Sequence, residues 1–159
     1  MFNRNVRSRR CRIEGCSRRG VAALEGAIVL SVFIVILFVM LDLGLMVLDY
    51  NLLTAASASL CRAAMVHGSM AAPQETMWGP TTATGNAADG SQYSQSFQQD
   101  LVTLPLKDVQ YTLEWPSGTN QPDDQVRATL TYQYQPIIPF VLGTQGINLQ
   151  SVSTMRVDH

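Results

Sequence analysis

The sequence has few histidines and cysteines, and those it has are poorly placed for chemistry. The two histidines are His67 and His159, and Cys61 is the only cysteine after residue 20. One thiol cannot form an internal disulfide, and neither histidine has the neighbouring Cys or acidic residues of a metal site. Glycine-rich phosphate loops, G-x-S-x-G elbows and Cys–His pairs are also missing. We therefore expect no enzyme, no cofactor, no bound metal and no small-molecule substrate.

Each end of the chain has few charged residues of one sign. Residues 1–20 hold seven arginines and one acidic residue, whereas residues 42–159 hold four basic and ten acidic residues. The two segments therefore carry net charges of +6 and −6, and such asymmetry indicates that they meet different environments. The acidic excess of the longer segment argues against nucleic acid as a partner.

One segment lacks charge altogether. Residues 26–41 read GAIVLSVFIVILFVML, and with residues 21–25 they make a stretch whose only charged residue is Glu25. As a helix, this stretch would be roughly 31 Å long, which matches the hydrocarbon core of a bilayer. The arginines that precede it predict a cytoplasmic N-terminus and an exported C-terminal part. We expect a leader over 1–20, a transmembrane helix over 21–48 and an exported domain over 49–159, anchored in the inner membrane.

Three other kinds of segment share parts of this pattern. A cleaved secretory signal would need a site such as Ala56-Ser57-Ala58, which lies well beyond the apolar run. A twin-arginine export signal at Ser17-Arg18-Arg19-Gly20 would have an apolar region interrupted by an acidic residue. A signal anchor that is never cleaved is the third reading.

Glu25 is the most informative residue of the apolar stretch. A carboxylate within a membrane span costs about 2.5–3.5 kcal/mol on insertion scales, and a retained one usually has a partner. Cleavage after Gly20 would give Val21 a free α-amine and make Glu25 the fifth residue of a helix, where the helix dipole favours an acid. The amine of a neighbouring subunit could then neutralise the carboxylate. The simpler alternative is an acid that lies at the lipid interface.

The chain resembles a known family in these and later segments. Residues 18–25 read Arg-Arg-Gly-Val-Ala-Ala-Leu-Glu, and residues 54–64 are rich in Ala and Ser with one Arg. Residues 132–139 and 151–158 suggest a strand pair that is separated by a proline-containing loop and finishes in Met-Arg-Val-Asp. This pattern, clearest over residues 18–67, is similar to a type IV prepilin leader and more closely resembles the TadE-like pseudopilins of the tight-adherence (Flp-type) pilus system.

The resemblance implies how the protein is processed and which partners it assembles with. It implies cleavage between Gly20 and Val21 by a prepilin peptidase, a role for Glu25 in assembly, and partnership with membrane lipid, other pilins and pilus assembly proteins. The chain departs from the family at Gly26, where Phe or Tyr is usual, and at Ser31, where Pro is frequent. The leading interpretation is a minor pilin or pseudopilin that serves adhesion or secretion, either in the inner membrane or in a surface pilus. The alternative is an uncleaved single-pass anchor that presents a binding domain outside the cytoplasm.

Periodicity beyond the anchor predicts an α+β domain. The helical pattern continues to a stop at Gly68, where an exposed loop begins and extends to residue 92. Side chains spaced for a short amphipathic helix follow and end at Pro105; they are Tyr93, Phe97, Leu101 and Leu104. Alternating residues then predict strands at 109–115, 126–134 and 147–157. We expect a pilin-like arrangement, in which the exported half of the long helix packs on a small antiparallel sheet.

Two features leave alternatives open. Ala55, Ser59 and Ala63 form a stripe of small residues that suits either packing in a filament or packing on the chain's own sheet. Residues 137–143 are unusually apolar for a loop, and they suit the membrane surface, a partner or the domain's own core. Cys61 we expect to be a small buried residue rather than a reactive thiol.

Overall fold

The computed structural model describes residues 14–69, 71, 76–138 and 145–158, and side chains from residue 20 onward within these ranges. Helix α1 (Glu14–Val66) comes first, and four strands follow it. Residues up to Met40 form one compact unit, and residues from Leu41 onward form a second. The C-terminal part of α1 therefore belongs to the folded domain.

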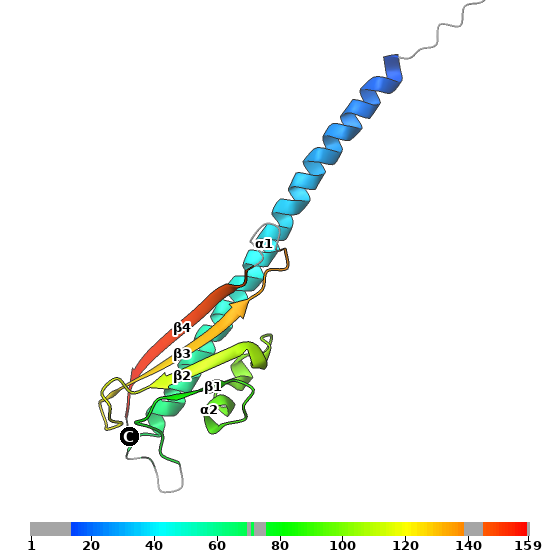
Figure 1. Cartoon of the computed structure of the whole chain (residues 1–159). Helices are drawn as coiled ribbons and strands as arrows, with labels where there is room; N and C mark the ends of the chain where they lie inside the picture. The colour runs from blue at the N-terminus through cyan, green and yellow to red at the C-terminus, as the bar shows by residue number, and fades with distance from the viewer. Residues whose placement is uncertain (1–13, 70, 72–75, 139–144, 159) are drawn as a thin grey trace, which may run out of the picture. The chain divides into compact units, whose positions relative to one another are not determined.

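The four strands form one antiparallel sheet in the order β1-β2-β3-β4 (Figure 1). They are β1 (Ala83–Asn86), β2 (Val109–Glu114), β3 (Gln125–Tyr134) and β4 (Ile147–Arg156). Each strand pairs antiparallel with the next one in sequence, so short connections suffice. The predicted α+β class and the three predicted strands are confirmed. Strand β1 was missed, because its sequence Ala-Thr-Gly-Asn has none of the apolar alternation that marks a strand.

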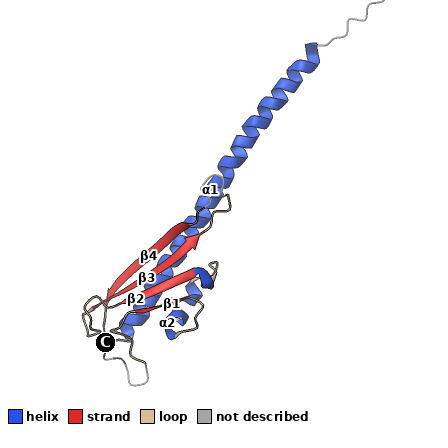
Figure 2. Ribbon diagram, in the orientation of Figure 1, coloured by secondary structure: helices blue, strands red, loops and turns tan. Residues whose placement is uncertain are grey.

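The core lies between the domain's part of α1 and one face of the sheet, as Figure 2 shows for the helix behind the red strands. Every second residue of β3 from Val126 to Leu130 is fully buried, as expected for a sheet with one covered face. On α1, the fully buried residues recur at spacings of three and four: Leu53, Ala56, Ser57, Leu60 and Cys61. The predicted packing of a long helix on a small sheet is confirmed.

The predicted amphipathic helix before Pro105 is wrong. The segment instead contains the one-turn helix α2 (Gln92–Gln95), the 3₁₀ turn η1 (Gln98–Asp100) and, after Pro105, the 3₁₀ turn η2 (Leu106–Asp108). Serine hydroxyls compete with the backbone here, since Ser94 Oγ donates to the Ser91 carbonyl and Ser96 Oγ to the Tyr93 carbonyl. The spacing nevertheless identified the buried residues Phe97, Leu101 and Leu104.

Gly79 holds the loop after α1 against the core. Its φ of +85° lies in the left-handed region, and a Cβ there would come within 2.6 Å of the Trp115 ring. Both backbone polar groups of the neighbouring Trp78 are hydrogen-bonded. Its N–H donates to the His67 carbonyl at 2.8 Å, and its carbonyl accepts from Asn120 Nδ2 at 2.8 Å. Only glycine fits this position without moving the backbone or the Trp115 ring.

We expect Gly79→Ala to lower the free energy of unfolding of the domain by about 2–5 kcal/mol, which combines left-handed strain with overpacking against Trp115. Gly118→Ala is the matched control, because Gly118 has a φ of +72° but nothing within 4 Å of its Cβ position. The free energy of unfolding of the control should fall by only about 1–2 kcal/mol. Urea unfolding of the full chain in detergent measures both values, and equal losses would contradict the role of the Trp115 contact.

Candidate functional site

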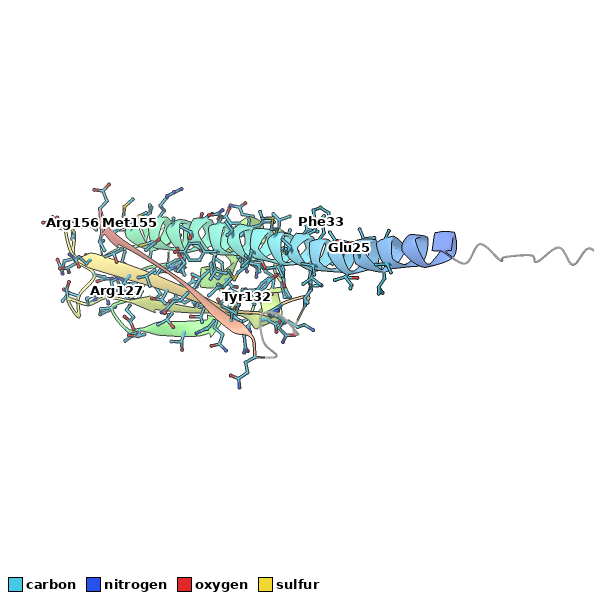
Figure 3. All side chains as sticks on the ribbon, turned by 90° about the horizontal axis from the view of Figure 1, so that it is seen from above. Glu25, Phe33, Arg127, Tyr132, Met155 and Arg156 are labelled. Atoms are coloured by element: carbon cyan, nitrogen blue, oxygen red, sulfur yellow. The ribbon has the colours of Figure 1, made fainter. Side chains whose placement is uncertain are left out.

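The residues predicted for processing and assembly lie on the N-terminal unit's part of α1. Gly20, Val21 and Glu25 are all helical and exposed (Figure 3 labels Glu25 and Phe33). Val21 and Glu25 are four residues apart, so they are neighbours on one helix face. Helix α1 begins before Gly20 and continues through the predicted cleavage position. Cleavage there would therefore place the new amine about one turn from the Glu25 carboxylate.

Apolar side chains surround this part of α1 on all sides. Between Val21 and Leu41, the exposed fractions of the large apolar side chains run from 43% at Ile34 to 71% at Met40, with Val39 alone half-buried. Such a surface is unfavourable in water and is typical of a helix that meets lipid or another apolar helix. The described residues contain one helix long and apolar enough to cross a membrane. This helix is compatible with a single-pass anchor.

A buried carboxylate joins α1 to the sheet at the start of the second unit. Asp42 is only 1% exposed, directly after the last residue of the uncharged run. Its carboxylate accepts a short hydrogen bond from the Tyr134 hydroxyl at the end of β3. The backbone N–H groups of Ile137 and Ile138 donate to its Oδ1 and Oδ2, at 3.3 and 3.4 Å. These donors compensate for the removal of the charge from water.

The Asp42 contacts fix the end of β3 and the first residues of the following loop. Tyr134 is 5% exposed, and its hydroxyl also lies 3.2 Å from the Asp42 carbonyl. Burial, followed by the hydrogen bond to Asp42 and the charge of Asp42, raises the pKa of Tyr134 well above its usual value. The phenol is therefore a permanent donor at physiological pH. Residues 139–143 of the apolar 137–143 segment lie outside the described residues.

Sequence reasoning missed the role of Asp42. Only Glu25 was singled out among the acids near the apolar run, although Asp42 also directly adjoins it. An acid on an otherwise apolar helix usually has a partner, and this rule applied to Asp42 as well. Its partner lies 92 residues away, however, and no local pattern could have identified Tyr134.

A seam of hydroxyl groups joins α1 to β4 further along the helix. Ser57 Oγ lies 3.0 Å from both Ser151 Oγ and Ser153 Oγ, and Ser151 Oγ donates to Thr54 Oγ1 at 3.4 Å. Ser57 and Ser151 are both buried. Small side chains let the helix approach the strand closely, and the hydroxyls satisfy one another there. Cys61 extends this seam, because its Sγ donates to the Val126 carbonyl at 3.5 Å. The expectation of a small buried cysteine is confirmed.

The small-residue stripe lies at the border of this packed face. Ala63 packs against the core, Ser59 is half-buried, and Ala55 is exposed. Packing on the chain's own sheet therefore accounts for the Ala63 end of the stripe. The Ala55 end remains on the open face of the helix.

Among the described residues, no group of three His, Cys, Asp or Glu side chains could hold a metal ion. An open groove beside η2 and β3 is lined by amides, hydroxyls, Lys107 and Asp108. Arg156 and Asp123 form an exposed ion pair at 2.7 Å, which contributes little to stability. Figure 3 places Arg156 and Met155 at the opposite end of the sheet from Tyr132.

Comparison with known proteins agrees with the resemblance read from the sequence. Residues 20–70 match the family model described as TadE-like protein. No curated protein and no solved structure matches the chain. The matched segment comprises the exposed apolar helix, the Asp42 position and the helix side of the Ser57 seam. The family suggests involvement in the Tad pilus systems and is generally non-enzymatic. Residues 20–70 are thus similar to the TadE-like family, in agreement with the resemblance seen over residues 18–67.

Proposed function

We propose that this protein is a non-enzymatic minor pilin or pseudopilin that takes part in assembling a tight-adherence pilus. A prepilin peptidase cleaves it between Gly20 and Val21 while it is anchored in the inner membrane. Its N-terminus faces the cytoplasm, and its folded domain lies on the other side. The mature protein then works by packing against other pilins and pilus assembly proteins.

One observation carries this proposal: Glu25 is the only acid between residues 21 and 41, where α1 exposes apolar side chains, and this stretch lies within the segment that matches the TadE-like family. In the part of the chain that the structure describes, no ion pair involves Glu25. A carboxylate at that depth needs a positive partner. Cleavage after Gly20 creates one, because it frees an α-amine whose reference pKa is about 7.7–8.0.

The exposed helix supports assembly as the mode of action. Its apolar side chains need an apolar environment at every stage, which lipid provides before assembly and the helices of other subunits provide afterwards. Pairing of one subunit's amine with the next subunit's Glu25 would set the axial position of each new helix. The folded domain, in contrast, buries its own hydrophobic core between α1 and the sheet.

The N-terminus of the protein recovered from membranes tests the proposal. We expect sequencing by Edman degradation or mass spectrometry to find a chain that begins at Val21. Gly20→Val should block this processing, because it places a branched side chain at the cleaved bond. Gly26→Val is the matched control, since both glycines have open space around the Cβ position, and it should be processed normally.

A mature chain that begins at Met1 in cells containing an active prepilin peptidase would contradict the proposal. The protein would then be an uncleaved single-pass anchor that presents a binding domain outside the cytoplasm. The groove beside η2 and β3 would be the first surface to test for a ligand, because amide and hydroxyl side chains line it.

A further inference from the structure

Val102 and Ile137 are the two most exposed large apolar side chains in the described loops of the folded domain, ahead of Met77 at 60%. Val102 is 81% exposed, the highest value among the described large apolar residues, and Ile137 is 69% exposed. They belong to different loops: Val102 precedes η2, and Ile137 follows β3. A single exposed apolar side chain is common on a protein surface, so these two are informative only through their position beside the apolar surface of α1.

Both loops approach acidic side chains of α1. The Ile137 N–H donates to Asp42 Oδ1 at 3.3 Å, so Ile137 lies at the level of Asp42 along the helix. Thr103, next to Val102, lies close enough to Asp49 to influence the pKa of that carboxyl group, so Val102 lies near the level of Asp49. Asp42 and Asp49 are seven residues apart, which corresponds to about 10 Å along the helix axis.

The surface of α1 changes character just beyond these two levels. Exposed apolar side chains continue along the domain's part of the helix as far as Leu48, with Leu41 57%, Val47 54% and Leu48 45% exposed. Tyr50 is 47% exposed, and the next exposed residue is Asn51. A tyrosine between an apolar and a polar helix surface is typical of the membrane interface.

We propose that the folded domain rests on the lipid bilayer through Ile137 and Val102, which enter the interface between headgroups and acyl chains beside α1. Ile137 is the deeper of the two, because Asp42 lies closer to the apolar run than Asp49 does. Continuity with the exposed apolar surface of α1 identifies lipid as the occupant. The Asp42 contacts fit this depth, since they satisfy the backbone donors of residues 137 and 138 without water.

Fluorescence quenching in vesicles tests this inference. The full chain, with Cys11→Ser and Cys16→Ser and with the buried Cys61 retained, receives a single new cysteine by Ile137→Cys, Val102→Cys or Val152→Cys. Each variant carries an environment-sensitive dye and is reconstituted into phosphatidylcholine vesicles whose acyl chains are brominated. Val152 is the matched control, because it is an apolar residue that is 52% exposed and lies midway along the edge strand β4. Near-UV circular dichroism verifies that each labelled chain is folded.

We expect strong quenching at residue 137, weaker quenching at residue 102 and none at residue 152. An unquenched dye at residue 137 would overturn the inference. Quenching at residue 137 that is lost as the ratio of chain to lipid rises would also overturn it, because a second copy would then be the occupant.

The inference relies on the membrane anchoring in the proposed function, but not on cleavage. A dye placed by Phe33→Cys tests the anchoring separately, because Phe33 lies within the uncharged run and is 59% exposed. A quenched dye at residue 33 with an unquenched dye at residue 137 contradicts only the contact of the domain with lipid. An unquenched dye at residue 33 contradicts the anchoring, and the inference fails with it.

Discussion

Replacing Asp42 with alanine is expected to lower the free energy of unfolding of the folded domain by about 2–4 kcal/mol. The Asp42 carboxylate is buried and accepts hydrogen bonds from the Tyr134 hydroxyl and from the backbone N–H groups of Ile137 and Ile138. The variant loses these charge-assisted bonds and leaves donors without their partner. Only the Tyr134 hydroxyl keeps an acceptor nearby, the carbonyl of residue 42 at 3.2 Å. Urea unfolding of the full chain in detergent measures the loss.

Two further variants show whether the contact itself is responsible. Asp49→Ala is the matched control: it removes an acid from the same helix, but this acid is half-buried, and its loss should cost about 1 kcal/mol or less. A double-mutant cycle of Asp42→Ala with Tyr134→Phe isolates the bond between the two side chains. We expect a coupling energy of about 1–3 kcal/mol. A coupling energy near zero would mean that Asp42 stabilises the domain without this bond.

Replacing Glu25 with alanine is expected to abolish or strongly reduce incorporation into the pilus while leaving membrane insertion intact. Removal of the only acid from the apolar stretch makes insertion about 2.5–3.5 kcal/mol more favourable on insertion scales. The same change removes the group that would pair with a neighbouring subunit's amine, so assembly loses its electrostatic attraction. Pilus yield and the amount of the variant protein in the membrane are measured together.

Ser31→Ala is the matched control for Glu25→Ala. Ser31 is an exposed polar residue on the same part of α1, and its hydroxyl donates to the Ala27 carbonyl at 2.8 Å within the helix. Ser31→Ala therefore removes a polar hydroxyl group from this part of the helix, but this hydroxyl is already satisfied within the helix and needs no partner from another chain. Normal pilus yield from Glu25→Ala, with the protein present in membranes at the usual level, would contradict the role of Glu25.

The elements with strong periodicity could be predicted from the sequence. The alternation from Val126 to Tyr134 identified β3, and the helical pattern that continues to Gly68 identified the part of α1 that covers the sheet. Local hydrogen bonding overrode the helical spacing around Ser94 and Ser96, where side-chain hydroxyls bond to nearby carbonyls.

Contacts between distant residues could not be predicted. The Tyr134–Asp42 and Ser57–Ser151 pairs are 92 and 94 residues apart. Each needs the sheet register and the helix position to be known together. The N-terminal residues differ from these pairs, because Gly20, Val21 and Glu25 were singled out from local spacing and from the resemblance. The structure adds only that they lie on an exposed helix, and their roles stay predictions.

The hydroxyl seam between Ser57 and β4 has a consequence for the order of events during synthesis. The ribosome completes α1 early, but the strand that lies against Ser57 is made nearly a hundred residues later. Until then, Leu53 and Leu60 lack part of their cover, and such long-range closure is slow. A nascent chain already held in the bilayer would therefore carry an unfinished domain, which a holding chaperone could protect until β4 emerges.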